Sequence, residues 1–163
     1  MGYYGTTIKF ENYHIARGRD PSVFEYEDVE AALLIASEWL DGSFRDRFPG
    51  LKVGMREQVR EWPRTAVLDR NGYAVSPLYV PNEIESATYE AAYRHLQTPG
   101  SLQVDYTPNK YSEVAVEGAV RVKYNNLDAS TIQKNFPIIG YILDGLLGGS
   151  GNFSPLSSGT VRV

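Results

Sequence analysis

The side chains that could carry acid–base or nucleophilic chemistry are few and scattered along the sequence. The two histidines, His14 and His95, lie outside any HExxH motif, and neither has a second histidine or a carboxylate motif beside it. The sequence has no cysteine, which excludes disulfides, thiolate zinc sites and a cysteine nucleophile. We therefore interpret both histidines as structural or surface residues.

Sequence motifs for phosphate, nucleotide or metal binding also fail their context. The glycine-rich run at 148–151 follows a predicted helix, whereas a phosphate loop precedes one. There is no GxSxG motif. The acidic cluster at 25–30 lacks EF-hand spacing and is better explained as favourable charge at the start of a helix. We predict no catalytic activity, no cofactor and no metal; a small enzyme of unknown type is a third reading.

The stretch with most potential for interaction is 55–65, MREQVREWPRT, in which arginines recur every four residues around Trp62 and Pro63. Arginines beside an exposed aromatic ring can bind a nucleic acid backbone and stack a base. Two glutamates dilute this patch, however, and the net charge of −4 gives no general attraction to nucleic acid. We favour ion pairing on a solvated face, and a structural anchor role for Trp62, Pro63 and the helical Trp39.

Three amphipathic segments predict the helices that position this stretch. The first, 26–41, has Val29, Ala32, Leu33, Ala36 and Leu40 on one face, with Gly42 as its expected stop. The second, 82–96, has a narrow face of small residues and a possible capping box between Asn82 and Glu85. The third runs from 136 to 147, and a shorter helix is expected at 11–18, closed by Gly18.

Extended segments and turns lie between these helices. Residues 1–10 are expected to form an irregular arm or a short edge strand, and 55–61 one or two helical turns ended by Pro63. Asn71-Gly72 predicts a hairpin between 65–68 and 73–75. Period-two alternation over 111–124 predicts two short strands, or one strand bent at Gly118.

Together these elements predict a mainly α (α+β) protein: a small helical bundle with a β-hairpin or extended strands and flexible terminal arms. We expect one domain at 1–147, including the strands near 111–124, and a flexible tail at 148–163 rich in glycine and serine. No apolar run is long enough to cross a bilayer, and the N-terminus lacks a secretory signal. The tail and arm could embrace neighbouring subunits or could be ends without a role.

The order of the motifs resembles a known family. EAALLIASEWLDG is followed by RFPG, QVREWPRT, VPNEIESATYEAAYRHL, an alternating valine-rich strand, FPIIGYILDGLL and a tail ending in VRV. This order is similar to that of the tailed-phage head–tail connector proteins, also called adaptor or head-completion proteins. Within them it resembles a group often labelled primosomal DnaT-like single-stranded-DNA-binding proteins. The resemblance covers roughly residues 11–163.

The resemblance implies a virion structural protein at the head–tail junction, made in the host cytoplasm. Copies of the chain, twelve in a typical case, would form a ring under the portal protein and continue the DNA channel. Its partners would be the portal, neighbouring copies and a downstream tail, stopper or nozzle protein, with genomic DNA passing without sequence-specific binding and no membrane. An acidic chain suits such a conduit, since a negative lumen lets DNA slide.

From these expectations we form two hypotheses about which residues meet partners. The C-terminal segment would order on assembly against the portal or a neighbour, burying apolar side chains of the tail and placing Arg162 beside them: Phe153, Leu156, Val161 and Val163. Ring contacts would join the acidic helix, including Glu27 and Glu30, to arginines of the next copy: Arg45, Arg47, Arg56 and Arg60. The alternative function is single-stranded-DNA binding, for which Trp62 fluorescence would be the probe.

Overall fold

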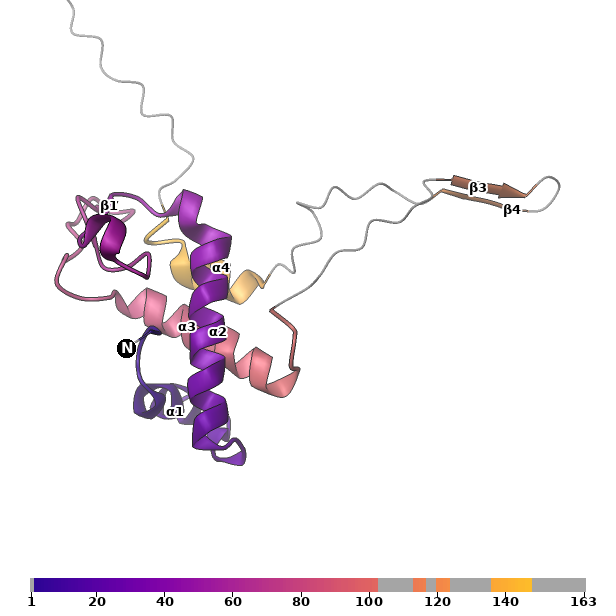
Figure 1. Ribbon diagram of the computed structural model, residues 1–163, viewed down its shortest axis with the longest axis horizontal. Helices are drawn as coiled ribbons and strands as arrows, with labels where there is room; N and C mark the ends of the chain where they lie inside the picture. The colour runs from indigo at the N-terminus through magenta and orange to yellow at the C-terminus, as the bar shows by residue number, and fades with distance from the viewer. Residues whose placement is uncertain (1, 103–112, 117–119, 124–135, 148–163) are drawn as a thin grey trace, which may run out of the picture.

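The computed structural model describes residues 2–102, 113–116, 120–123 and 136–147 (Figure 1). Over these residues the chain is mainly helical with two small antiparallel strand pairs, which confirms the predicted fold class. The α-helices are α1 (Thr7–Ile15), α2 (Tyr26–Phe44), α3 (Asn82–Gln97) and α4 (Pro137–Leu143). The strands are β1 (Leu51–Lys52), β2 (Arg64–Thr65), β3 (Glu113–Val116) and β4 (Val120–Lys123). Three short 3-10 turns are η1 (Pro21–Val23), η2 (Arg45–Arg47) and η3 (Met55–Glu57).

The centre of the bundle is the crossing of α2 over α3, with α1 beside the N-terminal end of α2 and α4 against α3 (Figure 1). The predicted faces of α2 and α3 are the buried ones, and alanines at the crossing let the two backbones approach closely. Each large apolar side chain removed from water here stabilises the fold by about 1.5–3 kcal/mol. The residues of the crossing are Val29, Ala32, Leu33, Ala36, Leu40, Ile84, Ala87, Ala91 and Ala92.

The N-terminal segment is more ordered than its sequence predicts. Helix α1 begins at Thr7, because the Thr6 side chain caps it by accepting a hydrogen bond from the Lys9 backbone N–H at 3.2 Å, and Phe10 is fully buried. The expectation of an irregular arm or edge strand over 1–10 is therefore wrong from Thr6 onward. The predicted closing glycine is confirmed: Gly18 has φ +70° and donates its N–H to the Ile15 carbonyl.

Helix α1 spans Thr7–Ile15 rather than the expected 11–18, and the ends of the other three helices also differ from the predicted ones. Helix α2 runs through Gly42 to Phe44, because a glycine weakens a helix without forcing it to stop and Phe44 packs its ring against Trp39. The capping box at the start of α3 is absent, since Pro81 is the cap residue and Asn82 is already helical. Helix α4 ends at Leu143, and the chain turns there with Leu146 and Leu147 still buried.

The turns between α2 and α3 use very little regular structure. Strands β1 and β2 pair antiparallel, with Leu51 opposite Thr65 and Lys52 opposite Arg64. The predicted hairpin around 69–72 is confirmed by an antiparallel bridge between Leu68 and Ala74. In the 111–124 region the two-strand reading is confirmed, because β3 and β4 pair antiparallel in register.

Two glycines in this part of the chain predict opposite effects of an added methyl group. Gly42 lies inside α2, and a Cβ added there would meet no atom within 4 Å, so Gly42→Ala should raise the free energy of unfolding by about 0.5–1 kcal/mol. Gly50 has φ +69°, and a Cβ on it would lie 2.2 Å from the Thr65 backbone oxygen. Gly50→Ala should therefore lower the free energy of unfolding by more than about 1 kcal/mol. Urea denaturation of both variants measures the difference, and a destabilised Gly42→Ala variant would contradict the continuous helix.

Candidate functional site

Trp62, the residue at the centre of the 55–65 stretch, lies inside the protein. Its side chain is 1 % exposed, and its ring meets Phe48 edge-on with centroids 5.6 Å apart. The peptide bond from Trp62 to Pro63 is cis. Because no face of the indole reaches the surface, a nucleic acid base has nothing to stack on, and the reading of Trp62 as a stacking platform is wrong for this fold.

The Tyr4 hydroxyl joins three separate segments around Trp62. It donates a hydrogen bond to Asp41 Oδ1 on α2 at 2.5 Å and accepts one from the Trp62 backbone N–H at 3.0 Å. The Tyr4 backbone N–H donates to Ser37 Oγ, also on α2, at 2.9 Å. Burial raises the pKa of Asp41, and the hydrogen bonds from Tyr4 and Arg60 offset this only in part.

Arg60 also contacts the N-terminal segment and α2 at this junction around Tyr4. Its guanidinium donates to the Gly2 backbone oxygen at 2.5 Å and lies 3.5 Å from Asp41 and 3.4 Å from Glu38. Only 12 % of the Arg60 side chain is exposed. Its place is thus inside one copy, where it ties the N-terminal segment to α2, although a contact to a neighbouring copy was expected of it.

A second buried carboxylate, Glu61, forms ion pairs that fix the loop around Trp62. Its oxygens lie 2.8 Å from Arg64, 3.1 Å from Arg45 and 3.4 Å from Lys52, so three cations share one anion. Arg64 also donates to the backbone oxygens of Pro49 and Gly50 at 2.7 and 2.8 Å. The loop shape is therefore held by side chains reaching backbone carbonyls in addition to the short β1–β2 pair.

The third buried carboxylate, Glu90 on α3, anchors α1. Arg19 contacts both of its oxygens at 3.1 Å, and Arg94 lies 2.7 Å away. Burial favours the neutral acid, but the hydrogen bonds from Arg94 and Arg19 outweigh it and lower the pKa of Glu90. His14, fully buried beside this group, accepts from Arg19 through Nδ1 at 3.1 Å and donates from Nε2 to the Tyr89 carbonyl at 3.2 Å. His14 is thus a neutral structural residue.

The other residues expected at partner surfaces lie as follows. Arg45, Arg47, Arg56 and Glu27 are exposed. Arg47 lies over the Phe44 ring, and Glu30 is half-buried because it accepts hydrogen bonds from Tyr3 and Tyr26. Trp39 is half-buried between the rings of Phe44 and Phe136, and the Pro63 carbonyl oxygen accepts hydrogen bonds from Val53 and Gln58. The tail residues Phe153, Leu156, Val161, Arg162 and Val163 lie outside the described residues.

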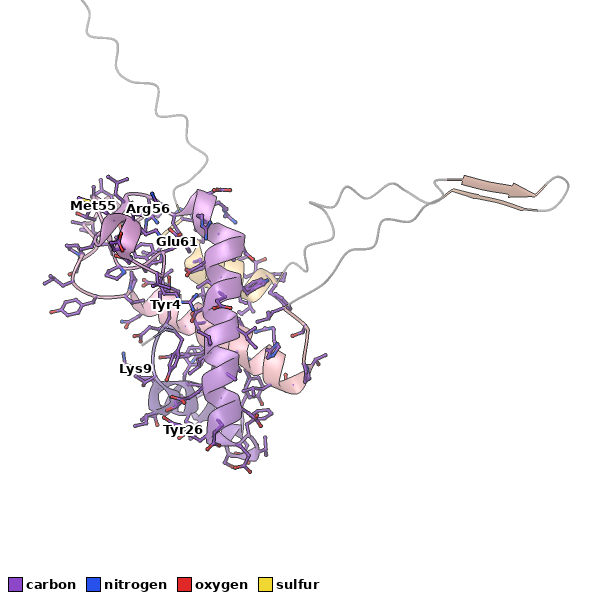
Figure 2. All side chains as sticks on the ribbon, in the orientation of Figure 1. Tyr4, Lys9, Tyr26, Met55, Arg56 and Glu61 are labelled. Carbon is purple, nitrogen blue, oxygen red and sulfur yellow. The ribbon has the colours of Figure 1, made fainter. Side chains whose placement is uncertain are left out.

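An exposed apolar surface on the loop from β1 to Arg60 was missed by the sequence reasoning. Leu51, Met55 and Val59 are 71 %, 80 % and 82 % exposed, and Val53 is also open to solvent. Arg56 is also exposed and lies near Met55 (Figure 2). Leu51, Val53 and Met55 alternate with other residues as in a strand, but the paired strand β1 ends at Lys52, and the sequence alone does not show that these side chains stay uncovered. Several large apolar side chains exposed along one short loop make it a candidate protein contact surface. We call this set, with Arg47, the loop surface.

Most cations of the described side chains are already neutralised within the chain. Ion pairs with carboxylates engage Lys9, Arg19, Arg45, Lys52, Arg60, Arg64, Arg70 and Arg94. Among the cations whose side chains the structure describes, Arg17, Arg47 and Arg56 remain without a carboxylate partner. Arg17 instead covers the Tyr13 ring. A nucleic acid backbone would therefore find few free positive charges on this body.

Neither a metal site nor a membrane span is present among the same residues. In the described ranges, no group of three or more His, Asp or Glu side chains is arranged to hold a metal ion. No helix of the described chain combines the length and the apolar character that crossing a bilayer requires.

A comparison with protein-family models matches residues 3–162 to the family described as "Putative DnaT-like ssDNA binding protein". The match spans nearly the whole chain, including the buried Trp62 junction and the loop surface. No curated protein and no solved structure matches the chain.

The Tyr4 junction predicts a strong effect from loss of one oxygen atom. Tyr4→Phe leaves the buried Trp62 N–H without a partner and removes a hydrogen bond from the Asp41 carboxylate, so the free energy of unfolding should fall by about 1–3 kcal/mol. Tyr26→Phe is the matched control, since Tyr26 is 56 % exposed and its bond to Glu30 is 3.3 Å long. The control should stay within about 0.5 kcal/mol of the native protein in urea denaturation. Equal effects of the two substitutions would contradict the junction.

His14 predicts a loss of stability in mild acid. Burial lowers the pKa of His14 from 6.5 to about 4. The unfolded chain therefore binds a proton that the folded protein does not, so stability is complete above pH 6.5 and falls as the pH drops toward 4, by up to about 3 kcal/mol. Thermal unfolding across this range measures the slope. His14→Gln, which has no titrating ring, should reduce this slope; an unchanged slope in His14→Gln would refute the assignment.

Proposed function

The chain belongs to the family described as "Putative DnaT-like ssDNA binding protein". For this member we propose a role that the family description does not name: a non-enzymatic virion structural protein, a head–tail adaptor. In this role, copies assemble as a ring under the portal protein, continue the DNA channel and receive a tail, stopper or nozzle protein below. The proposal places it in the virion and gives it partners that are proteins rather than a small substrate.

The observation that carries the proposal is the loop surface. Leu51, Met55 and Val59 are kept in water by a loop that Arg64 and Glu61 hold in one shape. A monomeric enzyme has no need of such a surface, whereas a subunit of an assembly covers it with another chain. The burial of Trp62 and the internal pairing of most described cations support the same proposal. They leave few exposed cations and no exposed Trp62 ring for a nucleic acid to bind.

The tail supplies the second half of the mechanism. Residues 148–163 carry one charged side chain, Arg162, and isolated apolar residues among glycine and serine. In the proposal this segment orders against the portal or an adjacent copy, where burial of Phe153, Leu156, Val161 and Val163 offsets the loss of chain entropy. A small number of apolar contacts suffices because many copies bind together.

Removal of the tail tests this role. A chain ending at 147 keeps Leu146 and Leu147, which are buried, so its body should fold as before. Its affinity for purified portal rings should fall at least about tenfold, the equivalent of 1.4 kcal/mol. A matched control, the full chain with Ser157→Ala and Ser158→Ala, should bind as the native protein does. Unchanged portal binding by the truncated chain in a sedimentation assay would refute the role of the tail.

Single-stranded-DNA binding is the second candidate, and the description of the family favours it. Because Trp62 is buried, its fluorescence is a poor probe, and the anisotropy of a labelled oligonucleotide is the sharper measurement. The adaptor proposal expects only weak binding that vanishes at physiological salt. Tight binding that tolerates salt, with Arg47→Ala and Arg56→Ala reducing it, would make this candidate the better one.

A further inference from the structure

The loop surface sits in an excess of positive charge. Residues 45–64 contain six arginines and lysines but three acidic side chains. Within the described chain, Arg47 and Arg56 are cations of this region that no carboxylate neutralises, and both are exposed. Asp46 and Glu57 are exposed beside these two arginines, so the loop surface is apolar with a modest excess of positive charge around it.

The opposite combination occurs at the start of the chain. On α1, Ile8 and Ile15 are 69 % and 61 % exposed and lie seven residues apart, on one face with Glu11 between them. At the start of α2, Tyr26 is exposed beside Glu27. Residues 11–30 contain six acidic side chains but two arginines, of which Arg19 is paired with the buried Glu90. We call this set the acidic surface.

The two surfaces lie at opposite ends of the same molecule. Figure 2 shows Met55 and Arg56 near the C-terminal end of α2 and Tyr26 at its N-terminal end. Helix α2 has 19 residues and so is roughly 28 Å long. One copy therefore has no way to bring its own loop surface onto its own acidic surface. Two copies meeting by the same surface would instead place cations on cations, or acids on acids.

We propose that the loop surface of one copy docks on the acidic surface of the next, in a head-to-tail contact. The apolar side chains of both surfaces are covered by the contact, while Arg47 and Arg56 meet Glu27 and its acidic neighbours. Such a heterologous contact leaves an unused surface at each end, so copies add one after another until a ring closes. This inference rests on the proposed assembly and names the surfaces that build it.

Crosslinking tests the contact, and the chain suits it because the native sequence has no cysteine. The exposed Met55 and Tyr26 are changed to cysteine singly and together, and the proteins are treated with a short bismaleimide, free and on portal rings. The double variant Met55→Cys with Tyr26→Cys should give a ladder of covalent species beyond the dimer, whereas each single variant should give no ladder. Tyr26→Cys with Leu78→Cys is the matched control, since Leu78 is 75 % exposed but lies outside the loop surface.

Charge exchange adds a second, independent readout. Arg56→Glu in the double-cysteine background should remove most of the ladder, and Glu27→Arg added to it should restore the ladder. Efficient dimers from Met55→Cys alone, or no ladder from the double variant in either setting, would overturn the head-to-tail contact.

If the ladder is absent while portal binding persists, the surfaces are wrong and the adaptor proposal stands. If portal binding is absent while the ladder forms, the adaptor proposal is the one that fails.

Discussion

The hydroxyl of Tyr4 is the atom on which the arrangement of this bundle depends. It donates to Asp41 on α2 and accepts from the backbone N–H of Trp62, two buried groups that need such a partner. The N-terminal segment, the longest helix and the Trp62 loop thus share one set of hydrogen bonds. The position of the loop, and with it of every exposed side chain between β1 and Arg60, follows from that junction.

Buried carboxylates explain how the charges of the chain are distributed. Asp41, Glu61 and Glu90 each lie inside the protein and each needs cationic partners, because an unpaired charge in this setting is costly. Asp41 and Glu61 are paired with Arg60 and Arg64, which the sequence suggested to be part of a solvated or nucleic-acid-binding patch, whereas Glu90 is paired with Arg19 and Arg94. Most of the described cations therefore have a structural role. The few exposed cations without a carboxylate partner are the ones best placed to contact other molecules.

The sequence was sufficient where a pattern had one physical explanation. The faces of α2 and α3, the hairpin at 69–72 and the strand pair near 111–124 follow from periodicity and turn chemistry. It was insufficient where long-range contacts decide. Gly42 looks like a helix stop until Phe44 is seen packed on Trp39, and Arg60 looks exposed until Tyr4 and Gly2 are placed beside it. The apolar side chains of the loop surface alternate over 51–55 as in a strand, but their exposure depends on the tertiary structure, which sequence spacing does not reveal.

The way Arg64 holds the loop has a consequence for how related chains can diverge. Its guanidinium donates hydrogen bonds to the backbone oxygens of Pro49 and Gly50, a group that every residue type has. Glu61 is the partner that pairs with Arg64 through its side chain. The scaffold of the loop is therefore nearly independent of the outward-facing residues. Substitutions at outward-facing positions with ordinary backbone angles can accumulate without altering the backbone, whereas Met55, at φ +49°, is more restricted. A lineage can thus change its binding specificity while the framework persists under selection at a handful of inner positions.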